Sequence, residues 1–252
     1  MEKVENINNI VEFIKKYKNK FEKRKYFLIN KDYEIEKRDP SFIIELANLY
    51  FEKKDENILK ILTTEFENTY IEKDKKIDRM SKIEKSKLIE SFRRALINQD
   101  KIHSVKLGNE LLLRDRHEFF RILYNISLIS QDCNKLVKTY FIEKVVEKVY
   151  EINGKSFNKN YEIIKEIVKN IINYFVKSEN IYLDYNSKSE IQNFIENKVD
   201  KLYLKIYNNM YDEIVEKYDV MNTSKLNFKD EKYYENMEIS KSKEILFENF
   251  IK

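Results

Sequence analysis

The scarcity of glycine and proline is the feature that most constrains the fold of this chain. Its 252 residues include two glycines, Gly108 and Gly154, and one proline, Pro40. Tight turns between strands depend on these residue types, because they supply backbone conformations that other residues adopt only at a cost. Helices with polar caps need neither type. The sequence therefore predicts an all-α protein, a multi-helix bundle of roughly eight to ten helices.

The composition sets the class of protein. Hydrophobic residues make up 42% of the chain and charged residues 37%, which is typical of a well-solvated globular protein with a substantial core. The single cysteine, Cys133, excludes an intramolecular disulfide and favours a reducing compartment. No apolar run reaches the roughly 18 residues that a membrane-spanning helix needs. We therefore expect a cytoplasmic protein without membrane contact.

Hydrophobic residues at helical spacing predict where the helices lie. A short strand or buried turn is expected at Tyr26–Ile29, and Asp39 followed by Pro40 is a typical helix start. The clearest predicted helices cover residues 4–21, 56–71, 101–113, 159–177, 188–218 and 240–251. The longest of them, 188–218, gives the fold a long C-terminal helix.

Side chains that can cap a helix mark several of the predicted starts. Ser81 with Glu84, and Ser187 with Glu190, have the spacing of a capping box, and Asp115 can cap the helix that follows it. Changes in charge and periodicity divide the chain into an N-terminal helical segment, a basic helical bundle segment and the C-terminal helices. These cover residues 1–78, 79–153 and 154–252, although one continuous domain is also compatible with the pattern.

Arginine is concentrated in one part of the chain. Six of the eight arginines lie between Arg79 and Arg121, whereas lysine is the usual cation elsewhere. This window holds eleven lysines and arginines against six aspartates and glutamates, a net charge of +5, while the whole chain has +4. The planar guanidinium matches pairs of phosphate or carboxylate oxygens. The candidate binding residues are Arg93, Arg94, Arg114, Arg116 and Arg121.

Three uses of these arginines are compatible with the sequence. They could follow a nucleic-acid backbone, or they could grip an acidic protein partner. They could also form ion pairs within a polar seam between helices, where the available carboxylates are Glu84, Glu90, Glu110 and Glu118.

Both histidines, His103 and His117, lie in the same window, but their spacing does not favour catalysis. HEPN ribonucleases carry an arginine and a histidine in one motif; here two residues separate Arg114 from His117 and eight separate Arg94 from His103. Neither spacing fits that motif. Each histidine is therefore expected to be hydrogen-bonded at a helix end, and a HEPN-like helical ribonuclease stays an alternative hypothesis.

No cofactor, metal or catalytic residue is assigned. The polar residues His103, His117, Asp132 and Cys133 lack the spacing of known metal sites. A nucleophilic Cys133 would need a histidine placed beside it by the fold. The two glycines lie too far apart to form a phosphate-binding loop, so ATP hydrolysis is not expected.

Tyrosine is abundant, with 18 residues. Tyr203, Tyr207, Tyr211 and Tyr218 share one side of the predicted long helix. They could stack on unpaired bases, but such a stripe is more often the edge of a core or a protein interface. Tyr203, Tyr207 and Tyr211 are therefore candidates for contact with a protein partner or a second copy of the chain.

One stretch resembles a known family. The segments Ser91–Leu96, Asp100–Leu113, Phe120–Leu123 and Leu128–Asp132 are similar to the helical collar of MgsA/RarA-type clamp-loader-like AAA+ ATPases. In this comparison Arg121 matches an Arg-Arg-Leu run of the family. The resemblance covers about 45 of the 252 residues, and the ATPase module has no counterpart. It implies a role in oligomerisation or as a DNA-replication accessory, with no catalytic residue.

Together these patterns favour a non-catalytic helical accessory or adaptor subunit of a nucleic-acid-processing assembly, in replication or transcription. The excess of Lys, Asn, Ile and Tyr is typical of AT-rich coding and fits a viral or phage origin, with a location in the host cytoplasm or a viral factory. The other alternative is a protein-interaction module, such as a defence or anti-defence inhibitor.

Overall fold

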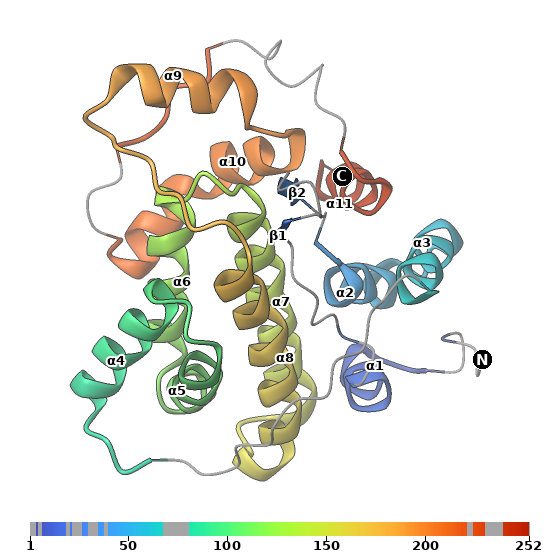
Figure 1. Ribbon diagram of the computed structural model, residues 1–252. Helices are drawn as coiled ribbons and strands as arrows, with labels where there is room; N and C mark the ends of the chain where they lie inside the picture. Colours follow the sequence, from blue (N-terminus) through green and yellow to red (C-terminus); the bar gives the residue numbers. More distant parts are fainter. Residues whose placement is uncertain are drawn as a thin grey trace.

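The computed structural model confirms the all-α class (Figure 1). The part of the chain that it describes consists of residues 4, 7–18, 21, 27–29, 35–37, 40–67, 81–220, 224–229 and 239–251. Within this part there are eleven helices and one pair of short antiparallel strands. The number of helices slightly exceeds the expected eight to ten.

The elements follow one another along the chain with short connections over most of its length. Their bounds are α1 Ile10–Tyr17, β1 Phe27–Ile29, β2 Ile35–Lys37, α2 Ile43–Lys53, α3 Glu56–Glu67, α4 Lys85–Ile97, α5 Lys101–Arg114, α6 Arg116–Ile129, α7 Asn134–Asn153, α8 Phe157–Lys177, α9 Lys188–Asn197, α10 Lys201–Tyr218 and α11 Lys241–Ile251.

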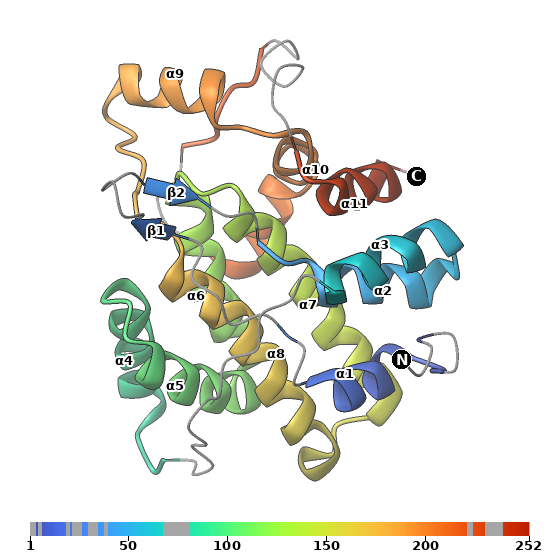
Figure 2. The same ribbon diagram turned by 45° about the vertical axis from the view of Figure 1, so that its right-hand side comes forward.

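The two longest helices, α7 and α8, form a hairpin at the centre (Figure 1). Helices α4 to α6 pack on one side of this hairpin and α1 to α3 on the other, while α9 to α11 gather at one end (Figure 2). The buried hydrophobic residues form a single cluster that extends from Val4 to Leu246. All three predicted segments therefore contribute to one core.

Both glycines have a structural explanation. Gly154 ends α7 with a φ of +67°, a backbone conformation that other residues adopt at a cost, and this lets the chain turn directly into α8. Gly108 lies where α5 meets α4, and a Cβ atom there would come within 2.8 Å of the Phe92 ring. The first glycine permits a turn, and the second permits close helix packing.

The predicted long C-terminal helix is wrong. Instead of one helix over 188–218, α9 ends at Asn197 and α10 begins at Lys201. Asp200 has extended backbone angles, and its side chain accepts a hydrogen bond from the amide of Tyr203 at 2.9 Å. An aspartate that caps a new helix in this way competes with continuation of the old one.

Other predicted helix starts are confirmed in part. Asp115 caps α6 and Ser187 caps α9, each accepting from the amide three residues later. The capping box at Ser81 is wrong, because the hydroxyl and amide of Ser81 both donate to Glu110 on α5. The helix expected over 4–21 is α1 alone, which begins after Asn9 caps it.

The two predictions made for residues 26–40, a strand or turn and a helix start, are also confirmed only in part. Of the two structures expected at Tyr26–Ile29, a short strand or a buried turn, the described residues Phe27–Ile29 form the strand β1, which pairs with β2 so that Phe27 lies opposite Lys37. Helix α2 begins at Ile43, later than Pro40 suggested, and Asp39 lies outside the described residues.

Candidate functional site

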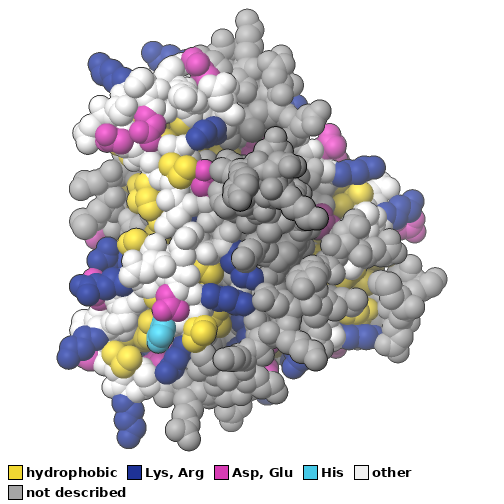
Figure 3. All heavy atoms as spheres, viewed as in Figure 1, with side chains coloured by type: hydrophobic (Ala, Val, Ile, Leu, Met, Phe, Trp, Pro, Cys, Tyr) yellow, Lys and Arg dark blue, Asp and Glu magenta, His cyan; other side chains and the backbone are white. Residues whose placement is uncertain are grey.

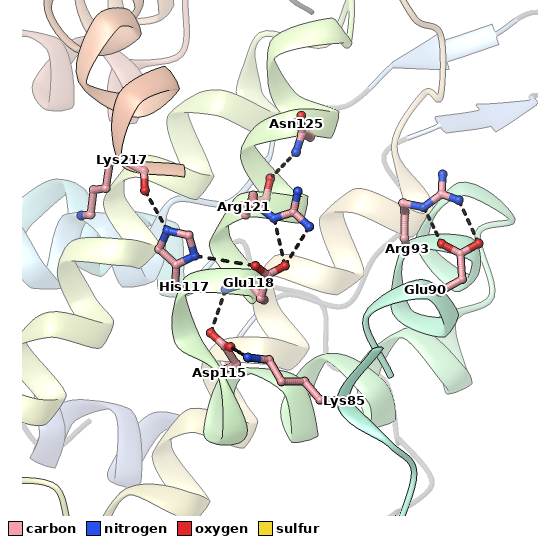
Figure 4. Close-up of polar contacts among 9 residues, drawn as sticks. All are labelled: Lys85, Glu90, Arg93, Asp115, His117, Glu118, Arg121, Asn125 and Lys217. Carbon is pink, nitrogen blue, oxygen red and sulfur yellow. Dashed lines mark hydrogen bonds and ion pairs between the residues drawn. The ribbon is translucent and has the colours of Figure 1, made fainter. Parts of the chain in front are cut away.

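Two of the candidate arginines, Arg93 and Arg94, lie on the exposed face of α4 and share one carboxylate. Arg93 donates to Glu90 through Nε at 3.0 Å and Nη2 at 2.9 Å, and the Nε of Arg94 lies 2.5 Å from the same group. The contact between Arg93 and Glu90 is drawn in Figure 4. Hydrogen bonds from Arg94 and Arg93 lower the pKa of Glu90 below its ordinary value. Two guanidinium groups on one carboxylate leave a net positive charge at this surface.

Arg121 forms an ion pair with a glutamate of its own helix, α6. Its Nε and Nη2 lie 2.9 Å and 2.8 Å from the carboxylate of Glu118 on α6. Glu118 also lies 3.9 Å from Nδ1 of His117, so one carboxylate stands between two basic side chains (Figure 4).

Both histidines are hydrogen-bonded at helix ends. Nε2 of His117, near the start of α6, lies 2.7 Å from the backbone carbonyl of Lys217 in the last turn of α10 (Figure 4). Since a carbonyl only accepts, Nε2 is the protonated nitrogen in this contact. Nδ1 of His103 lies 2.6 Å from Asp100, which caps α5. This is the arrangement that the spacing of the histidines favoured over catalysis.

Arg114 and the buried carboxylate of Glu110, both on α5, hold the segment that precedes α4. Its Nη1 donates to Glu110 at 2.9 Å and to the carbonyl of Ile83 at 2.7 Å. The Glu110 side chain is 1% exposed and also accepts from the amide and hydroxyl of Ser81, at 2.7 and 2.8 Å. Arg114 therefore holds the chain before α4 against α5, with its outer part still exposed.

Arg116 differs from the other four arginines. It is exposed, and within the described part of the chain it forms no ion pair with a carboxylate. Its guanidinium carbon lies 5.0 Å from the centre of the Tyr150 ring on α7, which is a cation–π contact. The charge of Arg116 is therefore available to a ligand, and the aromatic ring restricts where the side chain can point.

Arg114 and Arg116 both line a cleft of about 790 Å³ between the ends of four helices. The other lining residues come from the end of α5, the end of α7, the turn after it and the first turn of α8: Leu112, Leu113, Glu147, Tyr150, Glu151, Lys155 and Asn160. We call this the Arg116 cleft. Its volume lies within the range of about 300–1,000 Å³ that is typical of small-molecule sites.

The charges of the Arg116 cleft are mixed but not balanced. Its two carboxylates have cations nearby: Glu151 pairs with Lys148 at 3.2 Å, and Glu147 lies 3.9 Å from Lys217. Lys155, like Arg116, has no carboxylate partner among the residues that the structure describes. Lys217 pairs more closely with Glu143, at 2.8 Å, so Glu147 offsets part of the positive charge of the cleft. Arg116 and Lys155 thus leave a small surplus of positive charge, which can hold an anion.

Basic and acidic side chains are mixed on the face of the molecule that Figure 3 shows. In Figure 3 the lysines and arginines along the edge that α4 and α5 form are interleaved with acidic side chains. Along this edge, no continuous basic patch is seen among the described residues, so the position of each cation matters more than the number of cations.

The predicted tyrosine interface is wrong for the folded chain. Tyr203 and Tyr207 are 0% exposed and Tyr211 is 6% exposed. The segment 224–229 packs over α10: the amide of Leu226 donates to the Tyr207 hydroxyl at 2.6 Å, and the Phe228 ring lies 5.2 Å from that of Tyr207. These tyrosines belong to the core. The segment 224–229 covers the face of α10 that we expected to be exposed.

One polar cluster could not be foreseen from the sequence. The carboxylate of Glu143, on α7, accepts hydrogen bonds from the hydroxyls of Tyr124 and Tyr218 and from the ammonium of Lys217. Burial and the Glu143 carboxylate raise the pKa of Tyr124 well above its ordinary value. The four residues come from three helices, and no local spacing links them.

Two further kinds of reactive group were considered in the sequence, the thiol of Cys133 and a cluster of metal-binding side chains. Cys133 is buried, its thiol donates to the carbonyl of Lys198, and burial raises its pKa well above the ordinary value. A thiol that stays protonated is a poor nucleophile. Over the described ranges, no three His, Cys, Asp or Glu residues gather as a metal site would require, and no helix is long and apolar enough to cross a bilayer.

Comparison with known proteins identifies no relative: no family model, curated protein or solved structure matches this chain. Any function must therefore be argued from the residues and their geometry.

Proposed function

We propose that this chain is a non-catalytic accessory or adaptor protein of a nucleic-acid-processing assembly, and that it contacts the nucleic acid at the Arg116 cleft. The observation that carries this proposal is the state of Arg116. It is the candidate arginine that has an aromatic support, faces a cleft and lacks a carboxylate partner within the described residues. Arg93, Arg94, Arg114 and Arg121 each have a glutamate at hydrogen-bond distance.

The other arginines can still assist. Exposed ion pairs contribute little to stability, so a phosphate can displace the glutamate from Arg93 or Arg94 at small cost. Arg114 is different, since its partner Glu110 is buried and also holds Ser81. We expect Arg116 and Lys155 to make the main phosphate contacts, with Arg93 and Arg94 adding general attraction. The resemblance to a clamp-loader collar agrees with such an accessory role.

The test is the binding of fluorescent DNA and RNA oligonucleotides, measured by anisotropy across a salt series. Arg116→Ala should weaken binding several-fold and reduce the slope of log affinity against log salt by about 0.7–0.9, the value for one phosphate contact. Arg121→Ala is the matched control, because it removes the same charge from the same helix but from outside the cleft. It should change affinity and slope much less.

Two results would oppose the proposal. If Arg116→Ala and Arg121→Ala behave alike, the cleft is not the contact site. If labelled RNA is cut by the wild-type protein but not by His117→Ala, the protein is a ribonuclease rather than a non-catalytic subunit.

A further inference from the structure

The Arg116 cleft is too small to hold a nucleic-acid duplex, and this limits the kind of ligand that it can bind. At about 790 Å³, it can take a group of the size of one nucleotide. In a duplex the bases are stacked inside and their faces cannot reach a concave site. An unpaired nucleotide, in contrast, can place its base in a pocket while its phosphate stays at the rim.

The lining provides separate places for a base and a phosphate. Leu112, Leu113 and Tyr150 line the cleft, and the guanidinium carbon of Arg116 lies 5.0 Å from the centre of the Tyr150 ring. Aromatic rings and guanidinium planes are the surfaces on which unpaired bases stack. Lys155 and the outer nitrogens of Arg116 supply donors for a phosphate.

The carboxylates limit how much negative charge the cleft accepts. Glu147 and Glu151 also line it, so its surplus of positive charge comes from Arg116 and Lys155 alone. This suits a single phosphate group rather than a polyphosphate. A glutamate oxygen can also accept a hydrogen bond from the amino group of a base.

We infer that the Arg116 cleft binds one unpaired nucleotide through its base and a single phosphate, so that the protein selects single strands over duplexes. This rests on the proposed function and goes beyond it, because general phosphate contact alone would not distinguish the two forms. The same chemistry could come from a free nucleoside monophosphate or from a nucleotide within a strand.

The key variant is Tyr150→Ala, with Tyr150→Phe as its matched control. Anisotropy titrations would use one short oligonucleotide as a single strand and as its duplex. The single strand should bind at least tenfold more tightly to the wild type. Tyr150→Ala should weaken single-strand binding by about tenfold, within the range measured for loss of one stacked base, and leave duplex binding nearly unchanged. Tyr150→Phe keeps the ring and should retain the preference, which separates stacking from any general effect on the fold.

Competition by free nucleotides shows whether the cleft binds a free nucleoside monophosphate or a nucleotide within a strand. AMP should compete with the single strand, and ATP should compete no better than AMP. Binding of AMP with no binding of any oligonucleotide would support the nucleotide assignment and overturn the proposed function. Equal affinity for single strand and duplex would overturn the inference while leaving the proposed function intact. An affinity that rises with each added phosphate would also overturn it, since that is simple charge attraction.

Discussion

Lys138 and Glu45 form an ion pair inside the protein, with the ammonium nitrogen 2.7 Å from a carboxylate oxygen. Their side chains are 1% and 0% exposed. Lys138, on α7, also donates to the backbone carbonyl of Ser41 at 2.9 Å, just before α2. The pair therefore ties the N-terminal helices to the central hairpin through charge as well as through apolar contact.

Removing one member of this pair should be costly. We expect Lys138→Met to lower the free energy of unfolding by about 3–5 kcal/mol, because it leaves the Glu45 carboxylate buried without its cation. The measurement is guanidinium-induced unfolding followed by circular dichroism. The double variant Lys138→Met with Glu45→Leu should recover most of the loss, and simple additivity of the two single effects would contradict this explanation.

Asp200 has two roles that substitutions can separate. It caps α10 through the amide of Tyr203, and it pairs with the buried ammonium of Lys243 on α11. Asp200→Asn keeps the cap and removes the charge, whereas Asp200→Ala removes both. Both variants should be less stable than the wild type. The free energy of unfolding of Asp200→Ala should be about 1 kcal/mol lower than that of Asp200→Asn, because only the alanine variant lacks the cap. Equal stability of the two variants would mean that the cap contributes nothing to the start of α10.

Gly108 should not tolerate a methyl group. A Cβ atom there would lie 2.8 Å from Cε2 of Phe92 and 3.4 Å from Cε2 of Phe119, and these two rings are stacked and fully buried. Overpacking of this kind lowers the free energy of unfolding by about 1–3 kcal/mol. The better helix propensity of alanine offsets about 1 kcal/mol of this loss. Thermal unfolding of Gly108→Ala should thus show a net loss of stability. In a Phe92→Leu background the same substitution should become neutral or stabilising; a loss of equal size there would point to another cause.

The buried tyrosines predict sensitivity to high pH. Burial raises the pKa of Tyr124 and Tyr203 well above the ordinary value, whereas tyrosines of the unfolded chain ionise near pH 10. The folded state holds these protons more tightly, so the stability they contribute is complete below about pH 10 and is lost as the pH rises above it. The part of the absorbance change at 295 nm that comes from the buried tyrosines should therefore coincide with the loss of circular dichroism, in one cooperative step. Ionisation of all tyrosines before any loss of helix would contradict this.

Two phenylalanine substitutions should have opposite results at neutral pH. The Tyr124 hydroxyl donates to Glu143 at 2.6 Å, so Tyr124→Phe should destabilise the protein by about 1–3 kcal/mol, because it removes a donor from a buried carboxylate. The Tyr203 hydroxyl has no hydrogen-bond partner within the described residues, and Tyr203→Phe should be neutral or stabilising. Urea unfolding of the pair tests this directly, and an equal loss in both would disagree with the contacts seen here.

The sequence by itself determined the features that depend on local chemistry. Scarcity of glycine and proline predicted a helical protein, and the caps at Asp115 and Ser187 were visible because a cap joins residues only three positions apart. The spacing of the histidines did not fit the HEPN motif, and the remaining expectation, a hydrogen bond at a helix end, is confirmed for both. Two residues of the arginine-rich window, Arg114 and Arg116, line the cleft, and the use of that cleft stays a prediction.

Only the tertiary structure decided which of the candidate arginines pair with a carboxylate among the described residues and which does not. Local spacing did not reveal that Arg116 lies over Tyr150, 34 positions away, while Arg121 is held by a glutamate on its own helix. Nor could it show that residues 224–229 cover Tyr207, or that Lys243 reaches Asp200 at the start of α10. Caps and periodicity are set by neighbours along the chain, whereas burial and charge pairing are set by whichever distant segment the fold brings alongside.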